Sequence, residues 1–172
     1  VGGDFTQAGG VVTKYIARRT PSTWEALGGG FDDNSVYALA FDTSGMGTLY
    51  ASGLFTSASG VPLNHTARWN SSLAAWEALG SGIVPSGATV YALACSPSGL
   101  LYAAGDFTSI GGVPANYIAK WDGTSWRPLG SGANAKVGAL TVDAYGNLYA
   151  GGSFTTAGGV TVNHVAKWGK KL

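Results

Sequence analysis

The chain has 172 residues, of which 45% are apolar, 11% are charged and 28 are glycine, and its net charge is +1. A chain of this length can bury a core of its own, and this composition excludes a helix-rich globule or a disordered tail. The cations are dispersed, and no apolar run approaches the roughly 20 residues of a membrane helix, so we expect no nucleic acid partner and no membrane span.

The sequence repeats itself at a period of ~50 residues. A Phe-Thr pair and a tryptophan mark the repeat at Phe5, Phe55, Phe107 and Phe154, and at Trp24, Trp76 and Trp126. Internal repeats at this period indicate units that bury their apolar faces against one another. We therefore expect the fold to consist of repeated structural units.

Each repeat unit contains up to four short runs typical of β-strands, called here its first to fourth strands. In chain order, we expect strands at 1–6, 15–19 and 24–27, then 36–42, 49–56, 65–69 and 76–79, then 90–96, 101–108, 117–121 and 126–129, and finally 137–143, 148–155 and 164–168. The first strands are apolar at nearly every position, which predicts that both of their faces are covered. Small residues inside the second strands, such as Gly151 and Gly152, predict a close approach of neighbouring backbone.

Four antiparallel strands in a unit of roughly 40–50 residues are typical of a propeller blade. Turn signals such as Asp122-Gly123 separate the strands. We therefore expect an all-β fold, a β-propeller of four-stranded antiparallel blades with about 3.5 blade repeats in this chain. The single repeat domain, 1–172, divides into a partial blade at 1–30, blades at 31–82 and 83–132, and a partial blade at 133–172. A parallel β-solenoid is the alternative, although its coils are usually shorter, at roughly 20–30 residues.

The third unit carries the most informative segment, Gly105 to Trp126: Gly-Asp-Phe-Thr-Ser-Ile-Gly-Gly-Val-Pro-Ala-Asn-Tyr-Ile-Ala-Lys-Trp-Asp-Gly-Thr-Ser-Trp. It resembles kelch-type propeller repeats, and is similar to repeats of secreted bacterial propeller proteins and of the fungal cortical marker of cell polarity. The chain departs from the pattern at Arg19, which replaces a third-strand Trp, and at Gly138, which replaces the tyrosine of the other first strands. The fold hosts enzymes, binders and scaffolds alike, so the resemblance does not specify a function.

Residues that could carry chemistry recur at equivalent positions of the repeat. Asp42 and Asp143 end first strands, while Asp4 and Asp106 precede Phe-Thr pairs, so we interpret them as turn-forming residues rather than as catalytic acids. One cation per unit stands at the same third-strand position, in Arg18, Arg68, Lys120 and Lys167. We expect these cations to be exposed, with their stems covering apolar surface.

The metal-binding residue types also take structural positions. His65 and His164 stand where other units have tyrosine, which indicates ring packing, and Cys95 stands where other first strands have Phe or Val, which indicates core. We therefore expect no catalytic residue, no metal site and no cofactor.

The loops after the second and fourth strands should emerge on one face of an up-and-down sheet. Those after the second strands are near copies, whereas those after the fourth strands, at 28–35, 80–89 and 130–136, differ in length and content. Binding residues concentrate on loops held by a rigid scaffold, although tolerant linkers would look the same. The candidate ligand-binding residues are Phe31, Asp32, Asp33, Ile83 and Asn134.

These observations favour a non-catalytic binding or structural module, extracellular or at the cell surface, with a glycan or protein ligand. The alternative is a glycan-active or other enzyme with its site at the central entrance of the propeller. Open terminal strands predict a homo-oligomer or a place in a larger propeller. Asn64 and Asn70 begin Asn-x-Ser/Thr triplets, which are glycosylation acceptors if the protein is secreted by a eukaryote.

Overall fold

The computed structural model describes residues 1–45, 47–83 and 88–169, and the regular elements in these ranges are all β-strands. No helix of the length and apolarity needed to cross a bilayer occurs there. The strands are β1 (Gln7–Ala8), β2 (Val11–Val12), β3 (Ala17–Arg19), β4 (Trp24–Ala26), β5 (Val36–Phe41), β6 (Leu49–Gly53), β7 (Ser57–Ala58), β8 (Val61–Pro62), β9 (Thr66–Asn70), β10 (Ala75–Ala78), β11 (Thr89–Cys95), β12 (Leu101–Asp106), β13 (Ser109–Ile110), β14 (Val113–Pro114), β15 (Ile118–Trp121), β16 (Trp126–Pro128), β17 (Val137–Val142), β18 (Leu148–Gly152), β19 (Thr156–Ala157), β20 (Val160–Thr161) and β21 (Val165–Trp168).

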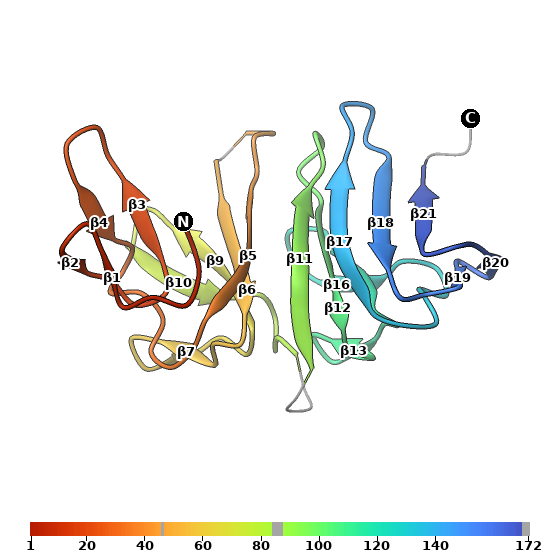
Figure 1. Cartoon of the computed structure of the whole chain (residues 1–172), viewed down its shortest axis with the longest axis horizontal. Helices are drawn as coiled ribbons and strands as arrows, with labels where there is room; N and C mark the ends of the chain where they lie inside the picture. The colour runs from red at the N-terminus through yellow and green to blue at the C-terminus, as the bar shows by residue number, and fades with distance from the viewer. Residues whose placement is uncertain (46, 84–87, 170–172) are drawn as a thin grey trace.

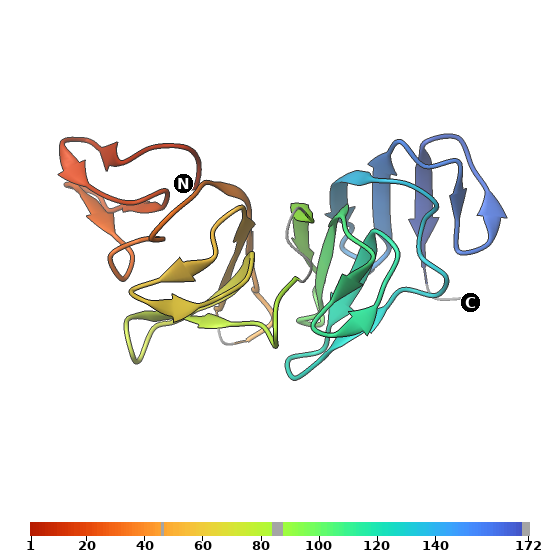
Figure 2. The ribbon, with the colours of Figure 1, turned by 90° about the horizontal axis from the view of Figure 1, so that it is seen from below.

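Two complete antiparallel sheets occupy the middle of the chain, with strand orders β5-β6-β9-β10 and β11-β12-β15-β16. The fourth unit contains β17-β18-β21, and the N-terminal unit pairs β3 with β4, beside a bridge between Gly2 and Ile16. The first strands β5, β11 and β17 stand side by side in the centre of Figure 1, and the four units follow one another along an arc in Figure 2. This blade arrangement confirms the propeller fold predicted from the repeats.

A short hairpin connects the second and third strands of every unit: β1–β2, β7–β8, β13–β14 and β19–β20. These hairpins meet the loops that follow the fourth strands, because the Asp32 amide donates to the Ser57 carbonyl and the Asn134 amide donates to the Thr156 carbonyl. In Figure 1 both sets of connections lie at the lower end of the molecule. The prediction that they share one face is therefore confirmed.

Apolar side chains form three core clusters, each shared by two adjacent units. Ile16 and Leu27 of the N-terminal unit pack with Val36 and Ala51 of the second. The other clusters join the second unit to the third and the third unit to the fourth in the same way. Each fully buried large apolar side chain contributes about 1.5–3 kcal/mol, so the contacts between sheets supply most of the stability.

The fourth-strand tryptophans also link neighbouring units through hydrogen bonds. The Trp76 indole Nε1 donates to the Leu27 carbonyl at 3.1 Å, and the Trp126 Nε1 donates to the Leu79 carbonyl at 2.9 Å. Both indoles are buried, and both acceptors lie just after the fourth strand of the preceding unit. Burial of the indoles is therefore coupled to the pairing of adjacent blades.

Arg19 takes over the partner position of a tryptophan in the N-terminal unit. Trp69 and Trp121 lie opposite Trp76 and Trp126 in the other sheets, whereas Arg19 lies opposite Trp24. Its guanidinium carbon is 5.7 Å from the centroid of the Trp24 ring. A cation–π contact thus replaces an aromatic pair at this position.

Coverage of the first strands differs from unit to unit. β11 packs against β5 and β17 and has no exposed residue, as its apolar sequence predicted. The prediction is wrong for β5, where Tyr37 and Phe41 are 47% and 56% exposed, and for β17, where several residues are exposed. An apolar run alone does not show which first strand is covered on both faces.

We predict that Trp126→Phe lowers the free energy of unfolding by about 1 kcal/mol, because the buried Leu79 carbonyl loses the shorter of its two hydrogen bonds and keeps only that from the Gly82 amide. Urea denaturation measures this value. Trp24→Phe is the matched control, since the Trp24 indole makes no such hydrogen bond with a described residue. Equal losses in the two variants would contradict a stabilising link between units.

Candidate functional site: a tyrosine ledge on the inner strands

Each first strand carries a β-bulge near its start, at the second residue of β5 and β17 and at the third residue of β11. The register with the second strand pairs Val36 with Gly53 and Ala38 with Ser52, so Tyr37 has no partner. The third and fourth units skip the equivalent residues, Tyr91 and Gly138. A bulge leaves the extra residue unpaired and redirects its side chain, and bulges are frequent beside functional sites.

The bulges depend on a glycine at the end of each second strand. A Cβ atom on these glycines would collide with the backbone carbonyl that precedes the first strand: Gly53 with Ser35, Gly105 with Thr89, and Gly152 with Lys136. Only glycine allows this approach, which confirms the close backbone contact predicted from the small residues of the second strands.

Two of the bulged residues place aromatic rings side by side. The ring centroids of Tyr37 and Tyr91 are 6.0 Å apart, and their planes differ by 11°. In the fourth unit Gly138 offers no ring, and the Lys136 Nζ lies 4.3 Å from the centroid of the Tyr91 ring. We call Tyr37, Tyr91 and Lys136 the tyrosine ledge.

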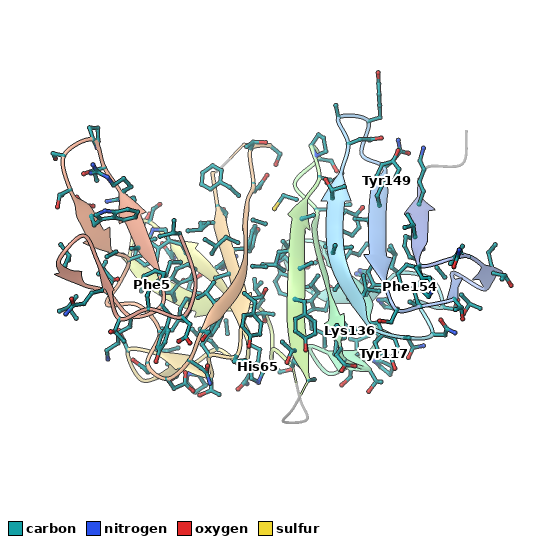
Figure 3. The ribbon with its side chains drawn as sticks, viewed as in Figure 1. Phe5, His65, Tyr117, Lys136, Tyr149 and Phe154 are labelled. Carbon is teal, nitrogen blue, oxygen red and sulfur yellow. The ribbon has the colours of Figure 1, made fainter. Side chains whose placement is uncertain are left out.

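The polar groups of the ledge are available for binding. Neither tyrosine hydroxyl is hydrogen-bonded to another described residue, and Lys136 makes no ion pair with a described carboxylate. Asp106 is the acidic residue at the end of the neighbouring strand, opposite Thr89, and it does not pair with Lys136. Figure 3 shows Lys136 toward the lower end of the molecule, together with His65 and Tyr117, and Tyr149 toward the upper end.

Two of the loop residues predicted to bind a ligand lie in the core. Phe31 is 0% exposed and stacks on Phe55, with ring centroids 3.8 Å apart, and Ile83 is 2% exposed. Phe31 and Ile83 therefore have no accessible surface to offer a ligand. Residues 84–87 of the second variable loop lie outside the described residues.

Asp32 connects its loop to the hairpin of the second unit. Its carboxylate accepts hydrogen bonds from the Gly60 amide, the Ser57 hydroxyl and the Ser59 amide. These bonds, that from Gly60 above all, lower the pKa of Asp32 because they stabilise the charged form. The carboxylate is exposed, but its visible role is to hold two connections together.

Asp33 and Asn134 make equivalent contacts in two units. The Asp33 carboxylate accepts from the amide and the hydroxyl of Thr56, and the Asn134 side-chain oxygen accepts from the amides of Thr155 and Thr156. Both side chains are exposed, so their role in ligand binding stays a prediction. No hydrogen bond joins these loop residues to the ledge among the described residues, although Asn134 and Lys136 belong to the same loop, 130–136.

Asp42 and Asp143 form turns, as their repeated positions predicted, and Asp122 does so too, whereas Asp4 and Asp106 accept no side-chain hydrogen bond from a described residue. The Asp122 carboxylate accepts from Arg127 and from the amides of Ser125 and Thr124, and these bonds lower the pKa of Asp122. The Asp143 carboxylate is held in the same way, chiefly by Asn147, which lowers the pKa of Asp143. Both carboxylates therefore stay ionised at neutral pH.

Cys95 is partly buried between the second and third units. Burial, followed by the negative charge of Asp42, raises the pKa of the Cys95 thiol to about 12. The thiol therefore stays protonated, in keeping with a packing role. In the ranges that the structure describes, no three His, Cys, Asp or Glu side chains gather closely enough to hold a metal ion.

The third-strand cations lie on the sheet surfaces, as predicted. Arg18 pairs with Glu25 and Arg68 pairs with Glu77 on the adjacent fourth strands. The Lys167 Nζ lies 5.5 Å from the centroid of the Tyr149 ring. Exposed pairs of this kind contribute little to stability.

A cleft of about 390 Å³ lies between the third and fourth units, near the ends of the first strands opposite to the bulges. Its lining includes Tyr102, Trp168 and Tyr145, and Tyr145 is 89% exposed. No charged residue lines this cleft. With Tyr145, the cleft presents a second exposed aromatic side chain, at the strand ends opposite to the ledge.

Both candidate glycosylation acceptors use their side-chain amides inside the protein. The Asn64 Nδ2 donates to the Ser81 carbonyl at 2.9 Å, and the Asn70 Nδ2 donates to the Glu77 carboxylate at 2.7 Å. A glycan attached to either nitrogen would replace one of these bonds. Use of the two acceptors stays a prediction.

A family model described as a β-propeller domain of unknown function, DUF5122, matches residues 97–120. These residues run from the turn after β11 through β12 and the β13–β14 hairpin into β15. This part of the chain is similar to a β-propeller repeat. No curated protein matches the chain.

The ledge was not among the residues predicted to bind a ligand. Its signal was present in the sequence, because Tyr37 and Tyr91 occupy one repeat position and Gly138 breaks the series. The apolar neighbours of these tyrosines, however, indicated a strand buried on both faces. Only the bulges show that the rings leave the packed face of the sheet.

We predict that Asp32→Asn lowers the free energy of unfolding by about 1 kcal/mol at pH 7, because it weakens charge-assisted hydrogen bonds that are open to water. Since the pKa of Asp32 is lowered in the folded protein, its stabilisation is present above about pH 4 and is lost as the pH falls through the folded pKa. Urea denaturation at pH 7 and pH 3 should show the difference from wild type shrinking at the lower pH.

The control is Asp4→Asn, because the Asp4 carboxylate is exposed and makes no hydrogen bond with a described residue. This variant should leave the unfolding free energy within about 0.5 kcal/mol of wild type. A difference between Asp32→Asn and wild type that does not depend on pH would contradict the role of the charge.

Proposed function

We propose that the chain is a non-catalytic binding and structural module, extracellular or at the cell surface, that holds a glycan or protein ligand at the tyrosine ledge. One observation carries the proposal: bulges present two equivalent tyrosines side by side, next to an unpaired lysine. Tyrosine offers an apolar face and a hydrogen-bonding group in one side chain, which suits it to recognition. Tyr37 is 47% exposed on a rigid sheet, so binding requires no opening of the fold.

The acidic residues support a binding role over catalysis. Hydrogen bonds lower the pKa of each of these carboxyls, chiefly from the Gly60 amide to Asp32, from the Arg127 side chain to Asp122 and from the Asn147 side chain to Asp143. A general acid needs a proton near neutral pH, which these groups do not retain. The repeat-by-repeat equivalence of the tryptophans and glycines is in keeping with kelch-like blades.

Self-association through sheet edges is part of the proposal, either as a homo-oligomer or within a larger propeller. β21 pairs with β18 on one side and with no other described strand, and Val165 on β21 is 64% exposed. Unpaired backbone groups next to exposed apolar side chains favour pairing with another chain. Light scattering of the purified chain should therefore give the mass of a dimer or a larger assembly, and a monomeric mass at all concentrations would contradict self-association.

We predict that Tyr37→Ala and Tyr91→Ala each weaken ligand binding by roughly tenfold or more, because each removes an aromatic surface from the centre of the site. An array of immobilised glycans provides the probes, and titration of the strongest binder gives the affinity. Both variants should unfold close to wild type in urea.

Tyr145→Ala is the control, because Tyr145 is an exposed tyrosine, more accessible than Tyr37, in the cleft near the opposite strand ends. It should bind as wild type does. Loss of binding in Tyr145→Ala, with binding kept in both ledge variants, would move the site to the cleft and overturn the proposal.

A further inference from the structure

The tyrosine ledge carries a positive charge that no described carboxylate neutralises. We propose that it selects an acidic glycan, a chain of uronic acid residues, over a neutral glycan of the same shape. This inference rests on the proposed function, because it concerns the ligand of the same site.

The three ledge side chains form a row. Tyr91 lies in the middle, with the Tyr37 ring on one side at 6.0 Å and the Lys136 ammonium on the other at 4.3 Å. A ligand that contacts all three groups must be extended, with an anionic group at the lysine end. A linear polymer with a carboxylate on every ring meets this requirement in either direction and in several registers.

The tyrosines suit a sugar ring. One face of Tyr37 is turned to Tyr91, and no other aromatic ring or cation of the described chain packs against Tyr37. The negative face of a phenol ring attracts the polarised C–H groups of a pyranose. The hydroxyls of Tyr37 and Tyr91 have no hydrogen-bond partner among the described residues and can donate to sugar oxygens, so both kinds of contact are available at once.

Lys136 supplies the charge selection. Its ammonium is already positioned over the Tyr91 ring, so a carboxylate gains a charge-assisted hydrogen bond without the full cost of ordering a free lysine. A neutral glycan would leave the ammonium facing uncharged oxygens. The preference for the acid should therefore reside in Lys136, whereas the affinity shared by both glycans should reside in the tyrosines.

The experiment compares each acidic probe with its own neutral form. Tetramers of galacturonate, mannuronate and glucuronate, and their methyl esters, are titrated by calorimetry into the purified chain. At least one tetramer should bind, its ester should bind at least about tenfold more weakly, and added salt should reduce the difference by screening.

Two lysine variants separate charge from packing. Lys136→Met should reduce binding of the acid to the level of the ester and leave ester binding unchanged. Lys167→Met is the matched control, because Lys167 also lies over a tyrosine ring, that of Tyr149, on another strand. It should leave the binding of both probes unchanged, and the near-UV spectra of both variants should match wild type.

The outcomes distinguish the two proposals. Equal binding of acid and ester, lost in Tyr37→Ala, would overturn the acidic-glycan inference and keep the ledge as a binding site. Binding of the acid that survives both Tyr37→Ala and Lys136→Met would overturn both. If none of the three tetramers binds while the array yields a neutral ligand that requires the ledge, the inference again fails and the proposed function stands.

Discussion

The burial of each sheet against the sheet of the next unit is the constraint on which this structure depends. A single four-stranded sheet has two apolar faces and cannot cover them alone. The three core clusters lie between successive units, and the indoles of Trp76 and Trp126 donate across two of these junctions. Each tryptophan therefore contributes both apolar area and a directional bond, which fixes how far one blade can shift relative to the next.

The same close packing creates the candidate site. The glycines at the ends of the second strands let the chain before each first strand approach closely, and the bulges at Tyr37 and Tyr91 lie beside these contacts. Their rings turn away from the crowded face and meet each other on the inner side of the arc. Replacement of the third ring by Gly138 leaves the Tyr91 face to Lys136, so a departure from the repeat gives the surface its only charged member.

Two of the variable loops have a structural role. Asp32 and Asp33 in the loop 28–35, and Asn134 in the loop 130–136, join their loops to the hairpin of the following unit, and Phe31 fills the core beneath. Asp33 and Asn134 are different side chains that accept from equivalent backbone amides. Variation among repeats therefore does not by itself mark a binding surface in this chain.

The sequence by itself determined the order of the strands in each unit, the positions of the turns and the recurrence of tryptophans and glycines. These follow from local periodicity and from the comparison of one repeat with the next. It also predicted the turn-forming role of Asp143 and the close approach at Gly152, since both are local. Only the tertiary structure decided that Tyr37 on β5 is exposed, because a bulge shifts the register by one residue and so reverses the direction of a side chain without changing the apolar pattern. It also decided that Phe31 is core and that Lys136 lies over Tyr91, because both contacts join residues that are far apart in the sequence.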